Sequence, residues 1–162
     1  VNKSINGEYD DHHAVAEVKL YGDDDDVADV IIVPVNSKGE SDNQSLVSEN
    51  ANLFKDDLFA VALTREPSSD VRIGIRAENI EQLSVSGDNG DSYSSEITLE
   101  FVTASWSDHQ NVHFKAEGDS MKEGLHYSRI VSDVEETSVG AYFNLKIIDA
   151  PRFLMVLYSR EA

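Results

Sequence analysis

The stretch DLFAVALTREPSSDVRIGIRAE, residues 57–78, predicts the fold of this chain most directly. It holds two runs of about seven residues, DLFAVAL and VRIGIRA, which are rich in β-branched and other apolar residues. Pro67 and the serines after it form a turn signal between the two runs. In the second run, apolar residues alternate with Arg72, Gly74 and Arg76, which is the period of a strand with one buried face. The stretch therefore predicts two β-strands joined by a turn.

Similar runs recur along the whole chain. They include HAVAEVKLY, VADVIIVPV, SEITLEFVTA, NVHFKAE and AYFNLKIID, and most are bounded by Gly, Asn, Asp, Ser or Pro. No window combines a sustained apolar stripe at helical spacing with a helix cap. The pattern predicts an all-β fold, an antiparallel immunoglobulin-like β-sandwich of about seven strands. Two polar loops, residues 36–45 and 86–95, are expected to be mobile and to face solvent.

Acidic side chains dominate the charge of the chain. Asp and Glu number 31 against 13 Lys and Arg, so the formal net charge is -18. Such a surface repels nucleic acid and anionic membranes, and it favours cations as partners. There is no cysteine, which excludes disulfides, thiol nucleophiles and thiolate metal ligands. No run approaches the ~20 apolar residues of a membrane span. We therefore expect no nucleic-acid partner, no membrane insertion, and an extracellular or cell-surface location.

The two ends of the chain carry the same order of features. Gly7 and Tyr9 precede a strand, an acidic run and a new apolar strand, and Gly140 and Tyr142 precede a similar series. The spacing of about 130 residues predicts a tandem repeat, the alternative being two strands that are alike by chance. The predicted division is a last strand and acidic junction of a preceding repeat at 1–26, a complete sandwich at 27–149, and the first strand of a following repeat at 150–162.

One family has a similar order of short motifs. The residues that carry the likeness are Leu99, Phe101, Trp106, Gln110, Val112, Asp119, Glu123, Gly124, His126, Tyr142 and Asp149, and upstream of them Glu49, Asp57, Leu63, Pro67, Asp70 and Val71. Over about residues 27–149 the chain resembles the Calx-beta repeat of large secreted and cell-surface proteins. It departs from that pattern at Gly118 and at Ala150-Pro151, where carboxylates of the family's calcium positions are missing.

The resemblance implies that several acidic segments meet at one tip of the sandwich. Carboxylates gathered there repel one another unless a cation binds, and calcium prefers six to eight such oxygen ligands. The expected calcium ligands are Glu49, Asp56, Asp57, Glu117, Asp119, Glu123 and Asp149. The run Asp23, Asp24, Asp25 and Asp26 is expected at the opposite pole, as the acidic junction with a preceding repeat. In both places the alternative is acidic surface that only binds water.

No arrangement of residues indicates catalysis, so the chain is predicted not to be an enzyme. The chain has no Gly-x-Ser-x-Gly elbow, and SGDNGD lacks the lysine and helix of a phosphate-binding loop. His109 and His113 point the same way in a strand but have no third ligand nearby in sequence. Arg72 and Arg76 are expected to pair across strands with Glu78 and Glu81 on a solvated face.

The expected function is that of a non-catalytic structural repeat in an extracellular surface, adhesin or fibre-forming protein. Calcium is the expected cofactor, because neutralising acidic tips would stiffen the joints between repeats. The expected partners are neighbouring repeats or identical chains, which would add through terminal strands. The alternative is a carbohydrate- or protein-binding module that contacts carbohydrate or a host surface protein through loops 36–45 and 86–95, with Tyr93 as one contact. A calcium sensor is the weaker third hypothesis.

Overall fold

The chain is all-β in the part that its computed structural model describes, residues 28–42, 45–50, 52, 55–118, 124–135, 142 and 155–158. These residues contain ten strands, a 3-10 turn at Thr103–Ser105 and no α-helix, which confirms the predicted class. The strands are β1 Val30–Val35, β2 Leu46–Ser48, β3 Asp57–Leu63, β4 Val71–Ala77, β5 Leu83–Ser86, β6 Glu96–Phe101, β7 Gln110–Ala116, β8 Leu125–Ser128, β9 Ile130–Val134 and β10 Met155–Tyr158.

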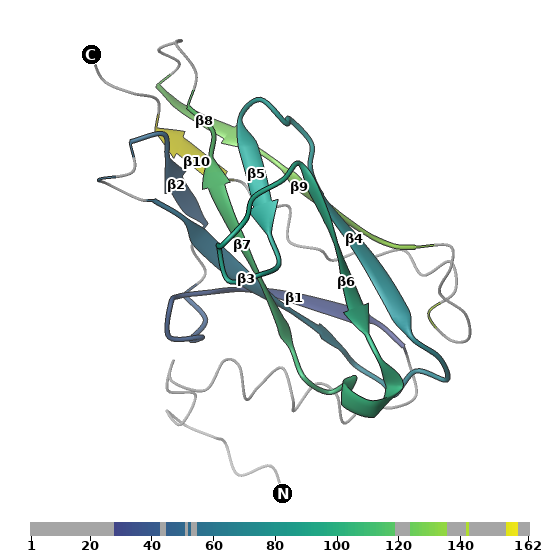
Figure 1. Cartoon of the computed structure of the whole chain (residues 1–162). Coiled ribbons are helices and arrows are strands. Elements are labelled where there is room, and N and C mark those ends of the chain that lie inside the picture. The colour runs from purple at the N-terminus through teal and green to yellow at the C-terminus, as the bar shows by residue number, and fades with distance from the viewer. Residues whose placement is uncertain are drawn as a thin grey trace, which may run out of the picture.

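Two antiparallel sheets pack as a sandwich, as the sequence predicted (Figure 1). One sheet has the strand order β1-β3-β7-β5 and the other has the order β6-β4-β9. A third, small sheet has the order β2-β10-β8, and only Arg129 separates β8 from β9. Within this small sheet, β10 pairs antiparallel with β8 but parallel with β2. The parallel pair was not expected from the sequence.

The position of β10 bears on the predicted repeat. Met155–Tyr158 falls in the segment expected to begin a following repeat, and it pairs with β2 and β8 of this chain. Residues 1–27 and the acidic run at Asp23 to Asp26 lie outside the described residues. The division at 26 and 149 therefore stays a prediction.

Burial follows the sequence pattern that predicted the strands. In β4, Val71, Ile73 and Ile75 are fully buried, while Arg72 and Arg76 are exposed. In β3, burial extends to both faces, because Phe59, Val61 and Leu63 enter the main core while Leu58 and Ala60 pack with Val35 in a second cluster. This explains why the β3 sequence is a continuous apolar run and the β4 sequence alternates. Trp106 is partly buried and packs against the main core.

The first and last described strands reach opposite ends of the sandwich. β1 starts beside the end of β3, because Val30 pairs with Leu63. β4 leaves that same end after the 64–70 turn and runs to Ala77, which pairs with Ile130. β8 precedes Ile130 and so extends further from the turn, where Leu125 pairs with Tyr158 of β10. At ~3.3 Å per strand residue, the start of β1 and the end of β10 are roughly 30 Å apart.

Candidate functional site

The described residues include four of the seven predicted calcium ligands. Glu49, Asp56, Asp57 and Glu117 are described, and Asp119, Glu123 and Asp149 lie outside the described residues. The four carboxylates do not form one cluster. In the part of the chain that is described, no group of three or more His, Asp or Glu side chains is placed to hold a metal ion. The expected tip as a whole stays a prediction.

Asp57 connects the starts of two strands. Its Oδ2 accepts a hydrogen bond from the Leu46 N–H at 2.9 Å, which holds the start of β2 beside the start of β3. Its Oδ1 accepts one from the Leu58 N–H at 2.9 Å. Burial raises the pKa of Asp57 to about 6, and the charges of Asp42 and Asp56 add to this effect. Asp42 lies in loop 36–45. Its acidic side chain is visible in the sequence, but Asp42 was not among the predicted calcium ligands.

Asp56 belongs to a different set of contacts from Asp57. Its Oδ2 accepts a hydrogen bond from the Tyr93 hydroxyl at 3.2 Å and lies 3.5 Å from Nδ1 of His113. Burial, and then the neighbouring Asp56 carboxylate, raise the pKa of Tyr93 to about 12. The Lys115 ammonium lies 4.7 Å from the centre of the Tyr93 ring. Tyr93 is therefore held by the protein itself at both its hydroxyl and its ring.

Glu117 and Glu49 lie apart from this pair. Glu117 Oε1 accepts a hydrogen bond from the Ser84 hydroxyl and is 3.4 Å from the Lys115 ammonium, beyond the end of β7. Glu49 follows β2, and its Oε2 is buried with no hydrogen-bond partner among the described residues. A buried carboxylate oxygen without a hydrogen-bond partner destabilises the folded state. Of the four described ligands, Glu49 is therefore the one that would gain most from a further partner.

Loop 86–95 contains hydrogen bonds among its own residues that the sequence analysis did not predict. Asp88 accepts hydrogen bonds from the Ser86 hydroxyl, the Ser92 N–H and the Ser92 hydroxyl, and these bonds hold the pKa of its carboxyl well below the usual range. Asn89 and Gly90 take positive φ values of 62° and 84° to turn the chain. The loop is thus a hydrogen-bonded turn, because short polar side chains bind nearby backbone groups. Binding of a ligand through it stays a prediction.

Loop 36–45 likewise closes on itself in its first half. The Asn36 side-chain oxygen accepts hydrogen bonds from the N–H groups of Lys38 and Glu40, and its amide donates to Glu40 Oε2 at 3.0 Å. The Asn36 N–H donates to the Glu40 carbonyl at 2.8 Å. Residues 43–44 lie outside the described residues.

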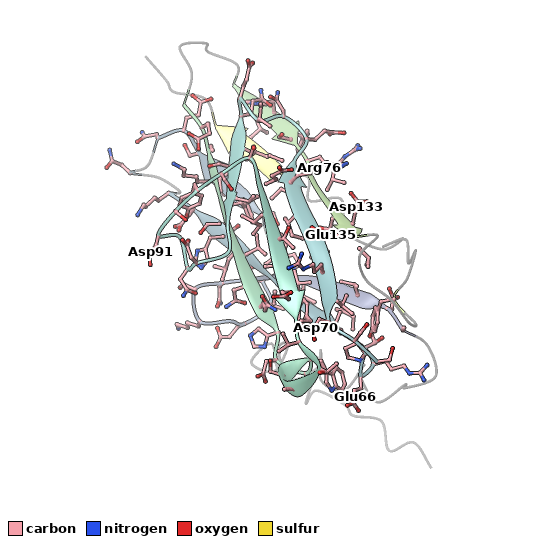
Figure 2. The ribbon with its side chains drawn as sticks, turned by 45° about the vertical axis from the view of Figure 1, so that its right-hand side comes forward. Glu66, Asp70, Arg76, Asp91, Asp133 and Glu135 are labelled. Atoms are coloured by element: carbon pink, nitrogen blue, oxygen red, sulfur yellow. The ribbon has the colours of Figure 1, made fainter. Side chains whose placement is uncertain are left out.

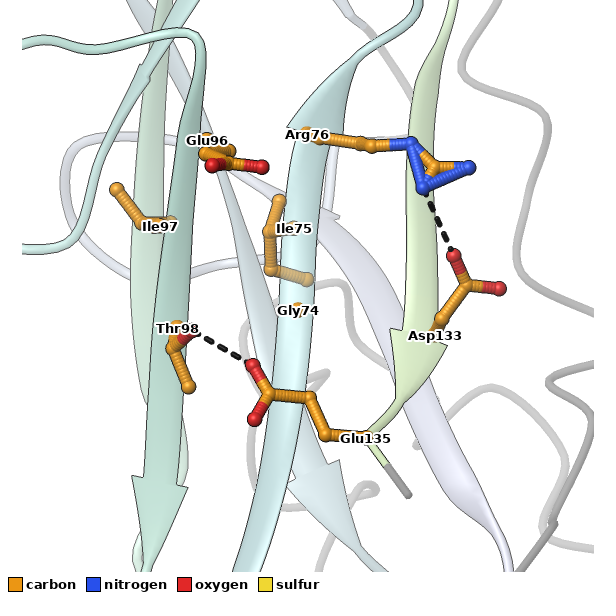
Figure 3. Close-up of a pocket in the computed structure, with 8 residues that line it drawn as sticks. All are labelled: Gly74, Ile75, Arg76, Glu96, Ile97, Thr98, Asp133 and Glu135. Carbon is orange, nitrogen blue, oxygen red and sulfur yellow. Dashed lines mark hydrogen bonds and ion pairs between the residues drawn. The ribbon is translucent and has the colours of Figure 1, made fainter. Parts of the chain in front are cut away.

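A groove of about 470 Å³ lies on the outer face of the β6-β4-β9 sheet (Figure 3). Its residues are Gly74, Ile75 and Arg76 of β4, Glu96, Ile97 and Thr98 of β6, Asp133 of β9, and Glu135 just after β9. Two interactions cross the groove: Arg76 donates to Asp133 at 3.3 Å, and Thr98 donates to Glu135 at 2.8 Å. Figure 2 shows Arg76, Asp133 and Glu135 on the same side of the molecule.

The ion pairs on this face differ from those predicted from the sequence. Arg72 pairs with Glu100 at 3.1 Å and Arg76 with Asp133, rather than with Glu78 and Glu81. Arg129 lies 3.5 Å from Glu78. The partners come from strands distant in sequence, and no local pattern places β6 and β9 on either side of β4.

Comparison with known proteins supports the fold but assigns the chain to no family. No protein-family model matches the chain, and no curated protein matches it. Among solved structures, a two-domain protein of unknown function from Bacteroides fragilis NCTC 9343 is similar, with a TM-score of 0.52 and 10% sequence identity. The match covers 90% of this chain and 49% of that protein, so the chain spans about half its length. The chain is thus a β-sandwich that resembles part of a larger protein.

No helix of the described residues is long and apolar enough to span a membrane.

Proposed function

We propose that this chain is a non-catalytic, Calx-beta-like structural module of a larger extracellular or cell-surface protein, and that it acts as a spacer. The observation that supports the proposal is that β1 starts at one end of the sandwich and β10 finishes at the other. Modules joined through such ends line up along their long axes, and a pulling force passes through each module from end to end.

The parallel pair of β2 and β10 suits a module under tension. A force between the two ends pulls β2, through β1, towards one end and pulls β10 towards the other. The two strands run in the same direction, with Leu46 beside Val156 and Ser48 beside Tyr158. The load therefore acts along the strands, and the hydrogen bonds between them must break together rather than one after another.

Single-molecule force spectroscopy tests this proposal. The full chain is pulled through handles at its two termini, and in a second form through cysteines introduced by Ser68→Cys and Asp108→Cys. These two turns lie at the same end of the sandwich, because the Thr103 N–H donates to Asp70 at 3.2 Å. Pulling residues 68 and 108 apart separates β3 from β7, and the hydrogen bonds between these strands break one at a time. We expect a clearly larger unfolding force through the termini, and equal forces in the two geometries would contradict a load-bearing spacer.

Calcium is proposed to stiffen the module at its acidic groups. Besides burial, the charges of Asp42 and Asp56 help to raise the pKa of Asp57, and a hard cation near these groups would offset that charge; Glu49, with its buried oxygen, is a separate acidic group. Calcium titration should raise the melting temperature to a plateau, beyond the effect of sodium chloride at equal ionic strength. The Asp42→Asn/Asp56→Asn variant should lose that rise. A response equal to that of sodium in the unmodified chain would remove calcium from the proposal.

The proposed partners are neighbouring modules or identical chains, which would join through terminal strands. Sedimentation across a hundredfold range of concentration separates the two cases. A constant mass supports a spacer that relies on covalent neighbours, and growth with concentration supports filament formation by identical chains.

A further inference from the structure

Three side chains from separate parts of the chain converge on the outer face of the β1-β3-β7-β5 sheet. Asp56 comes just before β3, His113 lies in β7, and Tyr93 belongs to the loop after β5. In β7, Val112 and Phe114 enter the main core, so His113 between them faces outward. The Asp56 Oδ2 atom lies 3.2 Å from the Tyr93 hydroxyl and 3.5 Å from Nδ1 of His113. The sequence pattern showed no third metal ligand near His113, and the tertiary structure brings an aspartate and a tyrosine to it.

Gly90 marks the point on which the three polar atoms converge. A Cβ atom added to this glycine would lie 3.0 Å from the Tyr93 hydroxyl, 3.6 Å from Asp56 Oδ2 and 3.7 Å from His113 Nδ1. The three atoms thus surround one point beside the backbone of the loop. Gly90 has a φ of 84°, which favours glycine, so the turn itself keeps a side chain away from this point.

The ring nitrogen of His113 that faces this point is unsatisfied. Nδ1 is buried and has no hydrogen-bond partner among the described residues. Its separation of 3.5 Å from Asp56 Oδ2 is longer than the roughly 2.7–3.2 Å of a protein hydrogen bond. A buried polar atom without a partner destabilises the folded state, so a ligand bound to Nδ1 would stabilise it. Bonds in tetrahedral zinc sites are about 2.0–2.2 Å long, which places neighbouring ligand atoms about 3.3 Å apart, close to both distances measured from Asp56 Oδ2.

We propose that Asp56 and His113 bind a divalent transition-metal ion of the zinc type, with the Tyr93 hydroxyl as a third ligand and water completing the tetrahedron. A nitrogen ligand with few oxygens suits zinc, whereas calcium prefers about six to eight oxygens. The set holds one histidine and one aspartate, so it differs from the clusters of three His, Asp or Glu that the described residues lack. The Asp56 side chain is 34% exposed, which gives an ion a path from solvent. This site goes beyond the spacer proposed above and does not depend on it.

The charges near the site leave it able to accept a cation. The Lys115 ammonium lies 4.7 Å from the centre of the Tyr93 ring, and it is 3.4 Å from Glu117 Oε1. Glu117 therefore offsets the one lysine charge that lies against the site. Among the described residues, Asp56 forms no ion pair with a lysine or arginine, so its carboxylate charge remains to be neutralised by a metal ion.

The test is a titration of the full chain with zinc chloride. Excess calcium chloride is present throughout, because the chain is acidic and calcium occupies sites made only of carboxylates. Long-range proton–nitrogen NMR of the histidine rings is the measurement. We expect the Nδ1 signal of His113 to shift and to saturate at one zinc ion per chain, while the ring signals of His109 stay in place. A His113 signal that does not move would overturn the proposal.

Matched variants measure the zinc affinity by calorimetry under the same conditions. His113→Gln should weaken zinc binding by at least about tenfold, since loss of even an outer partner of a metal ligand commonly has an effect of that size. His109→Gln removes a histidine four residues away and should bind zinc as the unmodified chain does. Asp56→Asn should likewise weaken binding, and Asp91→Asn, which removes an exposed carboxylate of the loop, should not.

Equal zinc affinities in His113→Gln and His109→Gln would show adventitious binding to the acidic surface and would overturn the proposal. The NMR titration uses the unmodified chain, so the proposal stays testable even where a variant fails to fold. Failure here leaves the calcium titration and the force experiment unaffected, so the proposals are tested separately.

Discussion

Tyr142 and Arg65 exchange two hydrogen bonds at the end of the sandwich where β3 finishes. The Tyr142 hydroxyl donates to the Arg65 carbonyl at 2.7 Å and accepts from the Arg65 N–H at 2.9 Å. The Tyr142 side chain is fully buried in the main core, and its burial raises the pKa of the hydroxyl. The pair fixes the chain at the point where it leaves one sheet for the other.

Replacing Tyr142 by Phe should therefore destabilise the fold. The ring still fills its space, but the Arg65 N–H and carbonyl each lose a partner, at a cost of about 1–2 kcal/mol. Urea unfolding measures the change. Tyr127→Phe is the control, because Tyr127 is 56% exposed and its replacement should change the free energy of unfolding by less than about 0.5 kcal/mol. Equal stability of the two variants would contradict a structural role for the pair.

Gly74→Ala should stabilise the protein. A methyl group at this position would meet other atoms only at 3.7 Å or beyond, which is ordinary contact, and Gly74 is not among the positive-φ residues. The gain is about 0.5–1 kcal/mol, since alanine has less conformational freedom to lose on folding. Gly90→Ala should have the opposite sign, because Gly90 has a φ of 84° and its new methyl would lie 3.0 Å from the Tyr93 hydroxyl. Thermal unfolding of both variants checks the contrast in sign.

The stability of the protein should depend on the protonation of Asp57. Burial raises its folded-state pKa to about 6 from 3.8, so the folded state binds this proton more tightly than the unfolded state does. This contribution is complete below pH 3.8 and is lost as the pH rises through 6. Compared with Asp57→Asn, which does not titrate, the unmodified chain should lose about 1 kcal/mol between pH 4 and 7, allowing for solvent screening.

Urea unfolding of both proteins across that range measures the difference. The Asn variant also loses one acceptor for a backbone N–H, which shifts the difference by a constant amount. A difference that does not change with pH would show that Asp57 titrates normally.

Asp88 should control the order of loop 86–95. Its carboxylate accepts hydrogen bonds from Ser86 and Ser92, so Asp88→Ala removes the centre of the turn. Hydrogen exchange at the Ser92 amide should become clearly faster. Asp91→Ala is the matched control, because Asp91 is exposed in the same loop and its side chain holds none of these bonds. Unchanged exchange at Ser92 in Asp88→Ala would mean that other contacts order the loop.

The strands were predictable because their signal is local. The alternation in VRIGIRA placed Arg72 and Arg76 on the solvent face, and the continuous run in DLFAVAL matched a strand buried on both faces. The partners of the two arginines were not predictable. Glu100 and Asp133 lie 28 and 57 residues from them in sequence, while the predicted partners, Glu78 and Glu81, lie within nine residues of them.

The candidate site was likewise predictable only in part. The sequence showed that acidic side chains are abundant near Asp56 and Asp57, but not that Asp56 contacts Tyr93 and His113 while Asp57 binds the Leu46 backbone. The groove gave no sequence signal apart from one glycine in a strand, since three separate strands supply its lining.

By itself, the sequence determined the class of the fold, the positions of several strands and the buried face of β4. Those properties depend on the two-residue period of a strand, which a short segment already contains. Only the tertiary structure decided which strands are neighbours, that β10 runs parallel to β2, and that Glu135 reaches over Gly74 to Thr98. These contacts join residues far apart in the chain, and they form because the whole core must be buried at once.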